Sequence, residues 1–158
     1  MRPFEEIVEE HGAVVMRVCR ALLGPHDAQD AWSETFLSAM RAYPDLRPRS
    51  NVRAWLITIA HRKAIDQTRK SSRAPRPTGD LPESPTAVGA PGPGDDDLRA
   101  ALEALPPKQR GAVIYRYLAD LPYGEVGALL ESSEAAARRS AADGIANLRK
   151  SYTKGPEQ

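Results

Sequence analysis

The sequence predicts an all-α protein built of two small helical domains that are joined by a flexible linker. Apolar residues recur at spacings of three and four along most of the chain, and no stretch alternates with period two over a useful length. Prolines and glycines stand where these periodic segments stop. Residues 71–94 hold six prolines and four glycines and almost nothing that can build a core, which predicts the linker.

The first 70 residues are expected to form helices throughout. Gly24 ends the first helix, and Asp27 is a suitable N-cap for the second. Ser50 or Asn51 caps the third helix. The expected buried residues are Phe4, Val8, His11, Val15, Val18 and Leu22 in the first helix, Trp32, Phe36, Ala39, Met40 and Tyr43 in the second, and Val52, Trp55, Leu56, Ile59 and Ala60 in the third.

A second helical domain is expected after the linker. Residues 98–105 form a short amphipathic helix, and Pro107 and Pro122 each stand at the opening of a further helix. Ser133 is a suitable N-cap for the last helix, in which apolar residues recur at spacings of four, four and three. The expected buried residues of the last helix are Ala137, Ala141, Ile145 and Leu148.

A short turn at Glu131 and Ser132 joins two of these helices, as in a helix-turn-helix motif. The second helix of that motif lies in the major groove of DNA. Arg138 and Arg139 would point outward among alanines, so that small side chains allow close approach while the arginines contact phosphates or guanine edges. An alanine-rich surface helix in an ordinary helical hairpin has the same pattern, so this stretch alone leaves both interpretations open.

Charge is strongly segregated along the chain, although the net charge is only +1. Residues 1–46 carry four basic and eight acidic side chains, whereas residues 47–76 carry nine basic and one acidic. Residues 77–97 carry five acidic side chains and no basic one. The basic block predicts a polyanionic partner, because charge confined to one stretch creates a field that the net charge conceals. A solvated face of lysines and arginines is the alternative interpretation.

Composition argues against several classes of function. No apolar run reaches the roughly 18 residues of a membrane span, and the acidic N-terminus lacks the order of a signal peptide. Cys19 is the single cysteine, which together with the missing export signal predicts a reducing cytoplasm. The histidines and the cysteine have no metal-site spacing, and no cofactor is expected. No nucleophile motif, paired carboxylates or glycine-rich phosphate loop is seen, so the chain is not expected to be an enzyme.

Segments in both halves of the chain resemble conserved segments of a known family. The segments are DAQDAWSETF (27–36), AWLITIAHRKAIDQTRK (54–70) and LEALPPKQRGAVIYRYLADLPYGEVGALL (102–130). The first two resemble conserved region two, and the third resembles conserved region four, of the extracytoplasmic-function (ECF) sigma factors of the sigma-70 superfamily. Two motif sets in the expected order and with the expected gap make the resemblance specific.

The resemblance implies a division of labour along the chain. Residues 1–72 are expected to bind the polymerase clamp and the −10 promoter element. Residues 73–96 would be an acidic linker, residues 97–152 a helix-turn-helix domain for the −35 element, and residues 153–158 a disordered tail. The implied partners are bacterial core RNA polymerase, promoter DNA and an anti-sigma factor.

The resemblance also implies which residues make these contacts. Arginines can neutralise a single DNA strand, and serine and asparagine can hydrogen-bond an extruded base. The expected −10 contacts are Arg47, Arg49, Ser50, Asn51, Arg53, Arg62 and Lys63. The expected −35 contacts are Ser133, Arg138, Arg139, Ala142 and Asp143. The expected polymerase contacts are Gln29, Asp30, Ser33, Glu34 and Arg41, on the outward face of the second helix.

Departures from the family pattern gather around the last helix. Glu131 replaces the usual small turn residue, and Asp143 stands where the family usually has an arginine. These changes concern promoter affinity and sequence preference rather than the fold. Two other interpretations therefore stay open: a helix-turn-helix regulator that binds DNA without polymerase, and a degenerate sigma-like protein that binds polymerase or an anti-sigma factor but scarcely reads DNA.

Overall fold

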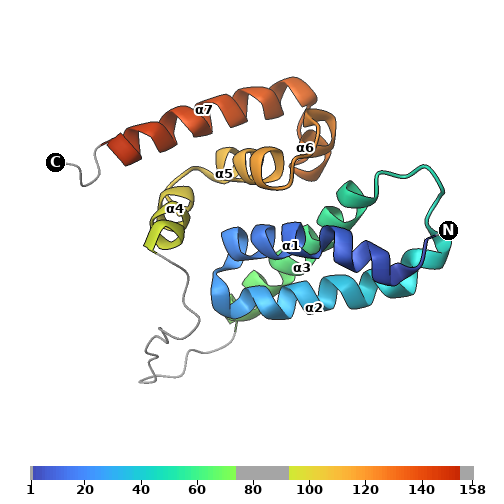
Figure 1. The fold of residues 1–158 in the computed structure, drawn as a ribbon. Coiled ribbons are helices and arrows are strands. Elements are labelled where there is room, and N and C mark those ends of the chain that lie inside the picture. Colours follow the sequence, from blue (N-terminus) through green and yellow to red (C-terminus); the bar gives the residue numbers. More distant parts are fainter. Residues whose placement is uncertain (1, 74–92, 154–158) are drawn as a thin grey trace, which may run out of the picture.

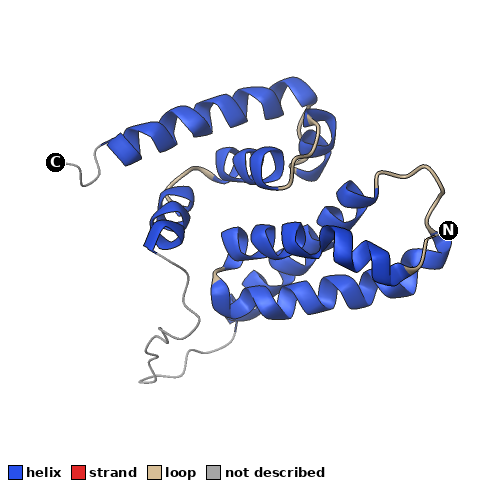
Figure 2. Ribbon diagram, viewed as in Figure 1, coloured by secondary structure: helices blue, strands red, loops and turns tan. Residues whose placement is uncertain are grey.

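The structure, a computed structural model, describes the backbone of residues 2–73 and 93–153 and the side chains of residues 2–70 and 97–151. Within these ranges all regular elements are helical (Figures 1 and 2), which confirms the predicted all-α class. The elements are α1 (Phe4–Leu23), α2 (Pro25–Ala42), a 3-10 turn (Tyr43–Asp45), α3 (Val52–Arg73), α4 (Pro93–Glu103), α5 (Pro107–Val113), a π-helical turn (Ile114–Leu118), α6 (Tyr123–Leu129) and α7 (Glu134–Thr153). Of the expected linker (73–96) and tail (153–158), residues 74–92 and 154–158 lie outside the described residues, and residues 73, 93–96 and 153 belong to helices.

None of the helices in the described ranges is both long enough and apolar enough to cross a membrane. The first three helices pack on one another as a bundle (Figure 1). Val15, Val18 and Leu56 are fully buried in its core, and burial of such a side chain stabilises the fold by about 1.5–3 kcal/mol. The indole N–H of Trp32 donates to the carbonyl of Gly12 at 2.9 Å and so fixes α2 against α1.

Local sequence signals set the helix boundaries. Gly24 joins α1 to α2 with a φ of 88°, a left-handed conformation that glycine adopts without strain. Contrary to the expectation that Asp27 caps the second helix, α2 begins at Pro25, because proline suits the first helical position. Asn51 caps α3 as predicted, since its side-chain oxygen accepts a hydrogen bond from the N–H of Ala54 at 3.0 Å.

The expected burial of Met40 is wrong. Its side chain is 51% exposed, whereas Phe36 and Ala39 beside it are buried. Met40 lies three residues after Leu37, which is 48% exposed, and Leu37 lies four residues after the exposed Ser33. This helical spacing places Met40 on the outer face of α2. A residue at the edge of an apolar stripe satisfies the spacing of both faces, and packing decides between them.

The second half differs from its expected outline in two places. α4 begins at Pro93, before the periodic segment that starts at Leu98. α5 continues into the π turn, in which the N–H of Ala119 donates to the carbonyl of Ile114, five residues back, at 3.1 Å. A π turn rotates the side chains that follow it relative to an α-helix. The apolar pattern does not predict this turn.

The two halves of the chain contact each other through directed polar groups. Nη2 of Arg110 donates to the carbonyls of Ala21 and Leu22 at 3.0 and 2.9 Å. The hydroxyl of Tyr115 lies 2.6 Å from Nδ1 of His61. Burial lowers the pKa of His61 and raises the pKa of Tyr115. A cleft of about 810 Å³ lies beside these contacts and is lined by both halves, so the halves are not packed together densely throughout.

Candidate nucleic-acid interface

The basic loop between α2 and α3 is the first candidate site. Arg47 and Arg49 are exposed, and the N–H of Ser50 donates to the carbonyl of Arg47 at 3.1 Å, which closes a turn. The side-chain oxygen of Asn51 is occupied by its capping hydrogen bond, so its amide N–H₂ group is the end suited to a base edge. The structure thus brings these four predicted residues together at the start of α3.

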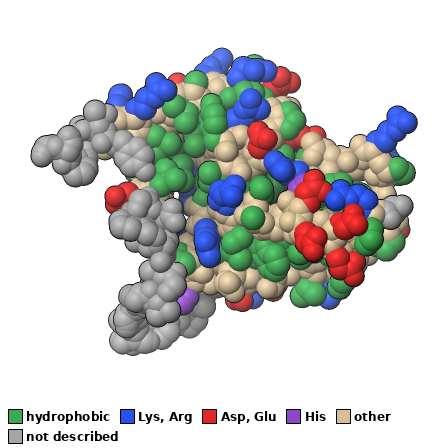
Figure 3. Space-filling model, viewed as in Figure 1, with side chains coloured by type: hydrophobic (Ala, Val, Ile, Leu, Met, Phe, Trp, Pro, Cys, Tyr) green, Lys and Arg blue, Asp and Glu red, His purple; other side chains and the backbone are tan. Residues whose placement is uncertain are grey.

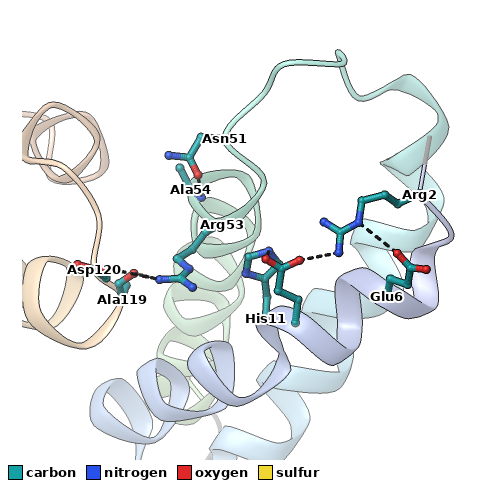
Figure 4. A network of polar contacts seen from close by, with 9 residues as sticks. Arg2, Glu6, His11, Asn51, Arg53, Ala54, Ala119 and Asp120 are labelled. Carbon is teal, nitrogen blue, oxygen red and sulfur yellow. Dashed lines mark hydrogen bonds and ion pairs between the residues drawn. The ribbon is translucent and has the colours of Figure 1, made fainter.

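Arg53, in the first turn of α3, does not join this loop. Its Nη1 donates to the carbonyl of Ala119 at 3.4 Å and lies 3.7 Å from Oδ2 of Asp120 (Figure 4). Asp120 is 81% exposed, and its φ of 58° presents it at the end of the π turn. Such an exposed ion pair contributes little stability. Arg53 is therefore tethered to the second half rather than buried there.

Arg62 and Lys63 lie further along α3. Arg62 is exposed, whereas Nζ of Lys63 lies 4.0 Å from Oε1 of Glu34 on α2. Lys63 is a predicted DNA contact and Glu34 a predicted polymerase contact, so this long ion pair links two predicted sites. At this distance and exposure the pair offers little resistance to separation.

The outer face of α2 carries polar and apolar side chains together. The five predicted polymerase contacts, Gln29, Asp30, Ser33, Glu34 and Arg41, are all exposed. Leu37 and Met40 are exposed on the same helix. Sequence reasoning missed both, although the spacing from Ser33 was the available signal. Methionine and arginine are enriched at protein interfaces, so this face suits a protein partner better than DNA.

A tight turn joins α6 to α7. Glu131 adopts a φ of 58°, and the N–H of Ser132 donates to the carbonyl of Gly127 at 2.8 Å, as in a Schellman motif. A Cβ atom at Gly127 would lie 2.8 and 2.9 Å from the carbonyl oxygens of Ser132 and Ser133. Glycine is therefore required there for the close approach of the turn to α6.

The recognition-helix candidate α7 starts at the predicted cap. The hydroxyl of Ser133 accepts a hydrogen bond from the N–H of Ala136 at 3.0 Å. Ala137 and Ala141 are buried, which confirms the predicted inner face. Lys and Arg side chains gather along the edge of the molecule where α7 lies (Figures 1 and 3). The five predicted −35 contacts, Ser133, Arg138, Arg139, Ala142 and Asp143, are all exposed.

The two arginines of α7 have different surroundings. Nη2 of Arg138 donates to Oε2 of Glu134 at 2.6 Å, and its guanidinium carbon lies 4.7 Å from the centroid of the Tyr123 ring. Arg139 has no ion pair or hydrogen bond with the residues that the structure describes, and it is not paired with Asp143. The fold thus leaves the charge of Arg139 uncompensated and holds Arg138 against α6.

Known proteins match both halves of the chain. The family model for sigma-70 region 2 matches residues 7–74, and the model for sigma-70 region 4 matches residues 95–148. The ECF RNA polymerase sigma factor SigE of Mycolicibacterium smegmatis is 33% identical over 141 residues, which are 82% of this chain and 54% of SigE. The RNA polymerase sigma factor CarQ of Myxococcus xanthus is 30% identical over 151 residues, which are 92% of this chain and 87% of CarQ.

A solved structure agrees with the fold. The sigma factor RpoE of Bartonella quintana, in complex with the anti-sigma factor NepR, has a TM-score of 0.77 at 20% identity, covering 96% of this chain and 99% of that chain. At this identity the similarity shows the fold alone. The two family models and the coverage of CarQ carry the assignment, and they confirm the resemblance seen in the sequence. The chain belongs to the ECF sigma factors of the sigma-70 family.

Proposed function

We propose that this protein binds core RNA polymerase and directs it to promoters, where residues 1–72 contact the −10 element and residues 97–152 contact the −35 element. The observation that carries the proposal is the pairing, in one chain of this family, of an exposed basic loop with a capped helix-turn-helix. This role requires binding and no bond-making step. The protein would therefore act as a regulatory subunit, without enzymatic activity or a cofactor. Its proposed place of action is the cytoplasm, where polymerase and promoter DNA are found.

The basic loop is suited to the non-template strand of an open promoter. Arg47 and Arg49 offer two exposed guanidiniums beside Ser50 and Asn51, which can hydrogen-bond a base edge. Extruding a base costs a few kcal/mol, so phosphate contacts from the arginines are needed to offset that cost. Arg62, exposed further along α3, would contact the duplex next to the opened bases.

The outer face of α2 is the proposed contact to polymerase. Leu37 and Met40 place apolar surface among the charged residues of this face. Removal of such surface from water contributes about 25 cal/mol per Å². We expect these two side chains to contribute more affinity than the polar residues around them, which would set orientation.

Simultaneous binding to both promoter elements would require the two halves to separate. The −10 and −35 elements are about 25 base pairs apart, which is about 85 Å along duplex DNA at 3.4 Å per base pair. In the structure the two halves contact each other, and we call this the closed arrangement. In it Arg53, a proposed −10 residue, contacts Ala119 and Asp120 of the proposed −35 domain. We therefore expect the closed arrangement to belong to the free protein and an extended one to the polymerase complex.

An anti-sigma factor is a proposed second partner. The structure of the sigma factor RpoE, which is similar to this fold, is a complex with the anti-sigma factor NepR. An anti-sigma factor that binds the closed arrangement would compete with polymerase, because polymerase would bind the extended arrangement.

Co-purification with core RNA polymerase and run-off transcription from a genomic library test the proposal. Tight binding to core enzyme, weak binding to free duplex DNA and start sites that depend on the added protein are expected. Nanomolar binding to free promoter DNA without affinity for core enzyme would favour a polymerase-independent regulator instead.

A sigma-like protein with weak −35 reading is the second candidate. Two features favour it: Asp143 on the exposed face of α7, and the ion pair of Glu134 with Arg138. Both place negative charge beside the arginines that would meet phosphate. A holoenzyme that depends on the −10 element and ignores changes in the −35 element would identify this case.

A further inference from the structure

The ring of Tyr123, at the start of α6, carries two guanidinium groups. The guanidinium carbon of Arg116, from the π turn, lies 4.5 Å from the ring centroid, and that of Arg138, from α7, lies 4.7 Å from it. The electrons of an aromatic face attract cations at this distance. Three elements that are separate in the chain thus converge on one side chain.

Arg116 is held in place by the backbone. Its Nη1 donates to the carbonyl of Leu121 at 3.1 Å, and the side chain is half-buried. The π turn sets its direction, because the inserted residue rotates the chain there. Such turns frequently mark functional sites in helices. Arg116 is therefore oriented before any ligand arrives.

Arg138 is held more loosely. Its ion pair with Glu134 joins two side chains that are 58% and 57% exposed, and such pairs contribute little in water. Contact with an aromatic ring uses the flat face of a guanidinium and leaves its N–H groups free to donate in the plane. A phosphate oxygen can therefore displace Glu134 while Tyr123 stays against Arg138.

We propose that Tyr123 is a positioning residue for promoter binding, which holds Arg116 and Arg138 together so that both contact the phosphate backbone beside the −35 element. Two cations beside one ring repel each other, and a phosphate group that contacts both lowers that repulsion. Phosphate contacts give affinity and register rather than sequence preference. The cluster would thus maintain −35 affinity in a helix that carries Asp143. This inference rests on the proposed function and extends its DNA surface from α7 to α6 and the π turn.

Holoenzyme affinity for a duplex −35 fragment, measured across a salt series, tests the inference. Tyr123→Leu removes the aromatic face and should weaken binding by about two- to fivefold, the range for exposed contacts of a cation with an aromatic ring. Tyr123→Phe keeps the ring and should restore most of the lost affinity. Arg116→Gln should lower the log-log salt slope by about 0.9, the value for one phosphate contact.

Two controls separate positioning from a general effect on the fold. Hydrogen bonding with Tyr123 raises the pKa of Tyr117, so Tyr117→Phe removes that contact and leaves the ring of Tyr123 in place. Lys150→Gln removes one exposed charge near the far end of α7. Neither control should reproduce the Tyr123→Leu loss. The double variant with Tyr123→Leu and Arg138→Ala should lose less binding free energy than the two single variants together. The reason is that part of the effect of Tyr123 on binding is exerted through Arg138.

Three outcomes would count against the inference. Fully additive losses for Tyr123→Leu and Arg138→Ala would show that the ring does not act through Arg138. An unchanged salt slope in Arg116→Gln would show that this arginine does not meet phosphate. If the wild-type holoenzyme binds normally and either of these two results is found, this inference is wrong but the proposed function stands. If the wild-type holoenzyme binds no promoter fragment, the proposed function is wrong as well.

Discussion

Replacement of Arg110 by glutamine should release the second half of the protein from the first. Nη2 of Arg110 donates to the carbonyls of Ala21 and Leu22 at 3.0 and 2.9 Å. Both carbonyls belong to the last turn of α1, where a helix leaves its carbonyls without an internal donor. Burial lowers the pKa of Arg110 below its ordinary value, and the side chain still carries its charge at neutral pH.

The expected size of the effect follows from these two bonds. A hydrogen bond with one charged partner contributes about 1.5–3 kcal/mol. Glutamine keeps one donor group with a shorter reach, and the site is half open to water, so we expect a loss of about 2 kcal/mol. At 1.4 kcal/mol for each factor of ten, the ratio of open to closed molecules should rise by about 30-fold. Apparent affinity for core polymerase should rise by at most the same factor, because only the open form would bind.

Single-molecule energy transfer between dyes on Asp45→Cys and Lys150→Cys, both exposed positions, measures the opening. Cys19 does not compete for the dye, because it is buried and burial raises its pKa to about 12. Lys108→Gln is the matched control, since it removes an exposed charge from the same helix as Arg110. An unchanged dye distance together with unchanged core affinity would refute the conclusion that these bonds hold the closed form.

Other predictions concern the turn, the histidine and the loop. Glu131→Gly should raise the free energy of unfolding by about 1 kcal/mol, since a left-handed non-glycine residue costs roughly 1–2 kcal/mol; lower stability in urea denaturation would contradict this strain. Burial lowers the pKa of His61 beside Tyr115, so the contribution of neutral His61 to closure should be fully present above the ordinary pKa of about 6.5. It should decrease as pH falls toward the lowered value, with no such step in His61→Gln. Arg47→Gln with Arg49→Gln should reduce permanganate reactivity of −10 thymines and spare core binding; unchanged reactivity would remove this loop from the mechanism.

The features that the sequence predicted correctly are local ones. Gly24 ends α1, Asn51 caps α3 and Ser133 caps α7. Each of these signals acts through hydrogen bonds or backbone angles within four residues, so the pattern of neighbouring residues is enough to recognise it. The spacing of apolar residues predicted the buried helix faces for the same reason. Met40 is the exception, because its position fits the spacing of both the buried and the outer face of α2.

The features that could not be predicted depend on distant residues or on side-chain direction. Arg53 and Ala119 are 66 residues apart in the chain, and no local pattern indicates that they meet. On α7, Asp143 lies four residues after Arg139, a spacing that allows an ion pair, but the observed pair joins Arg138 to the earlier residue Glu134. Helical side chains lean toward the N-terminus of their helix, which brings Arg138 back over Glu134 and against α6.

The contacts of Arg53 and Arg138 have a common physical consequence. Each is an arginine proposed to meet DNA, and each lies beside a carboxylate that is more than half exposed. A phosphate can replace either carboxylate at little cost, since water already screens both pairs. The backbone and ring contacts of the two arginines then decide whether each can bind phosphate in the closed arrangement. Arg53 must leave the carbonyl of Ala119 before it can act, whereas Arg138 keeps Tyr123 beneath it and is ready where it stands. Promoter opening by the loop should therefore depend on separation of the two halves, and −35 binding by α7 should not.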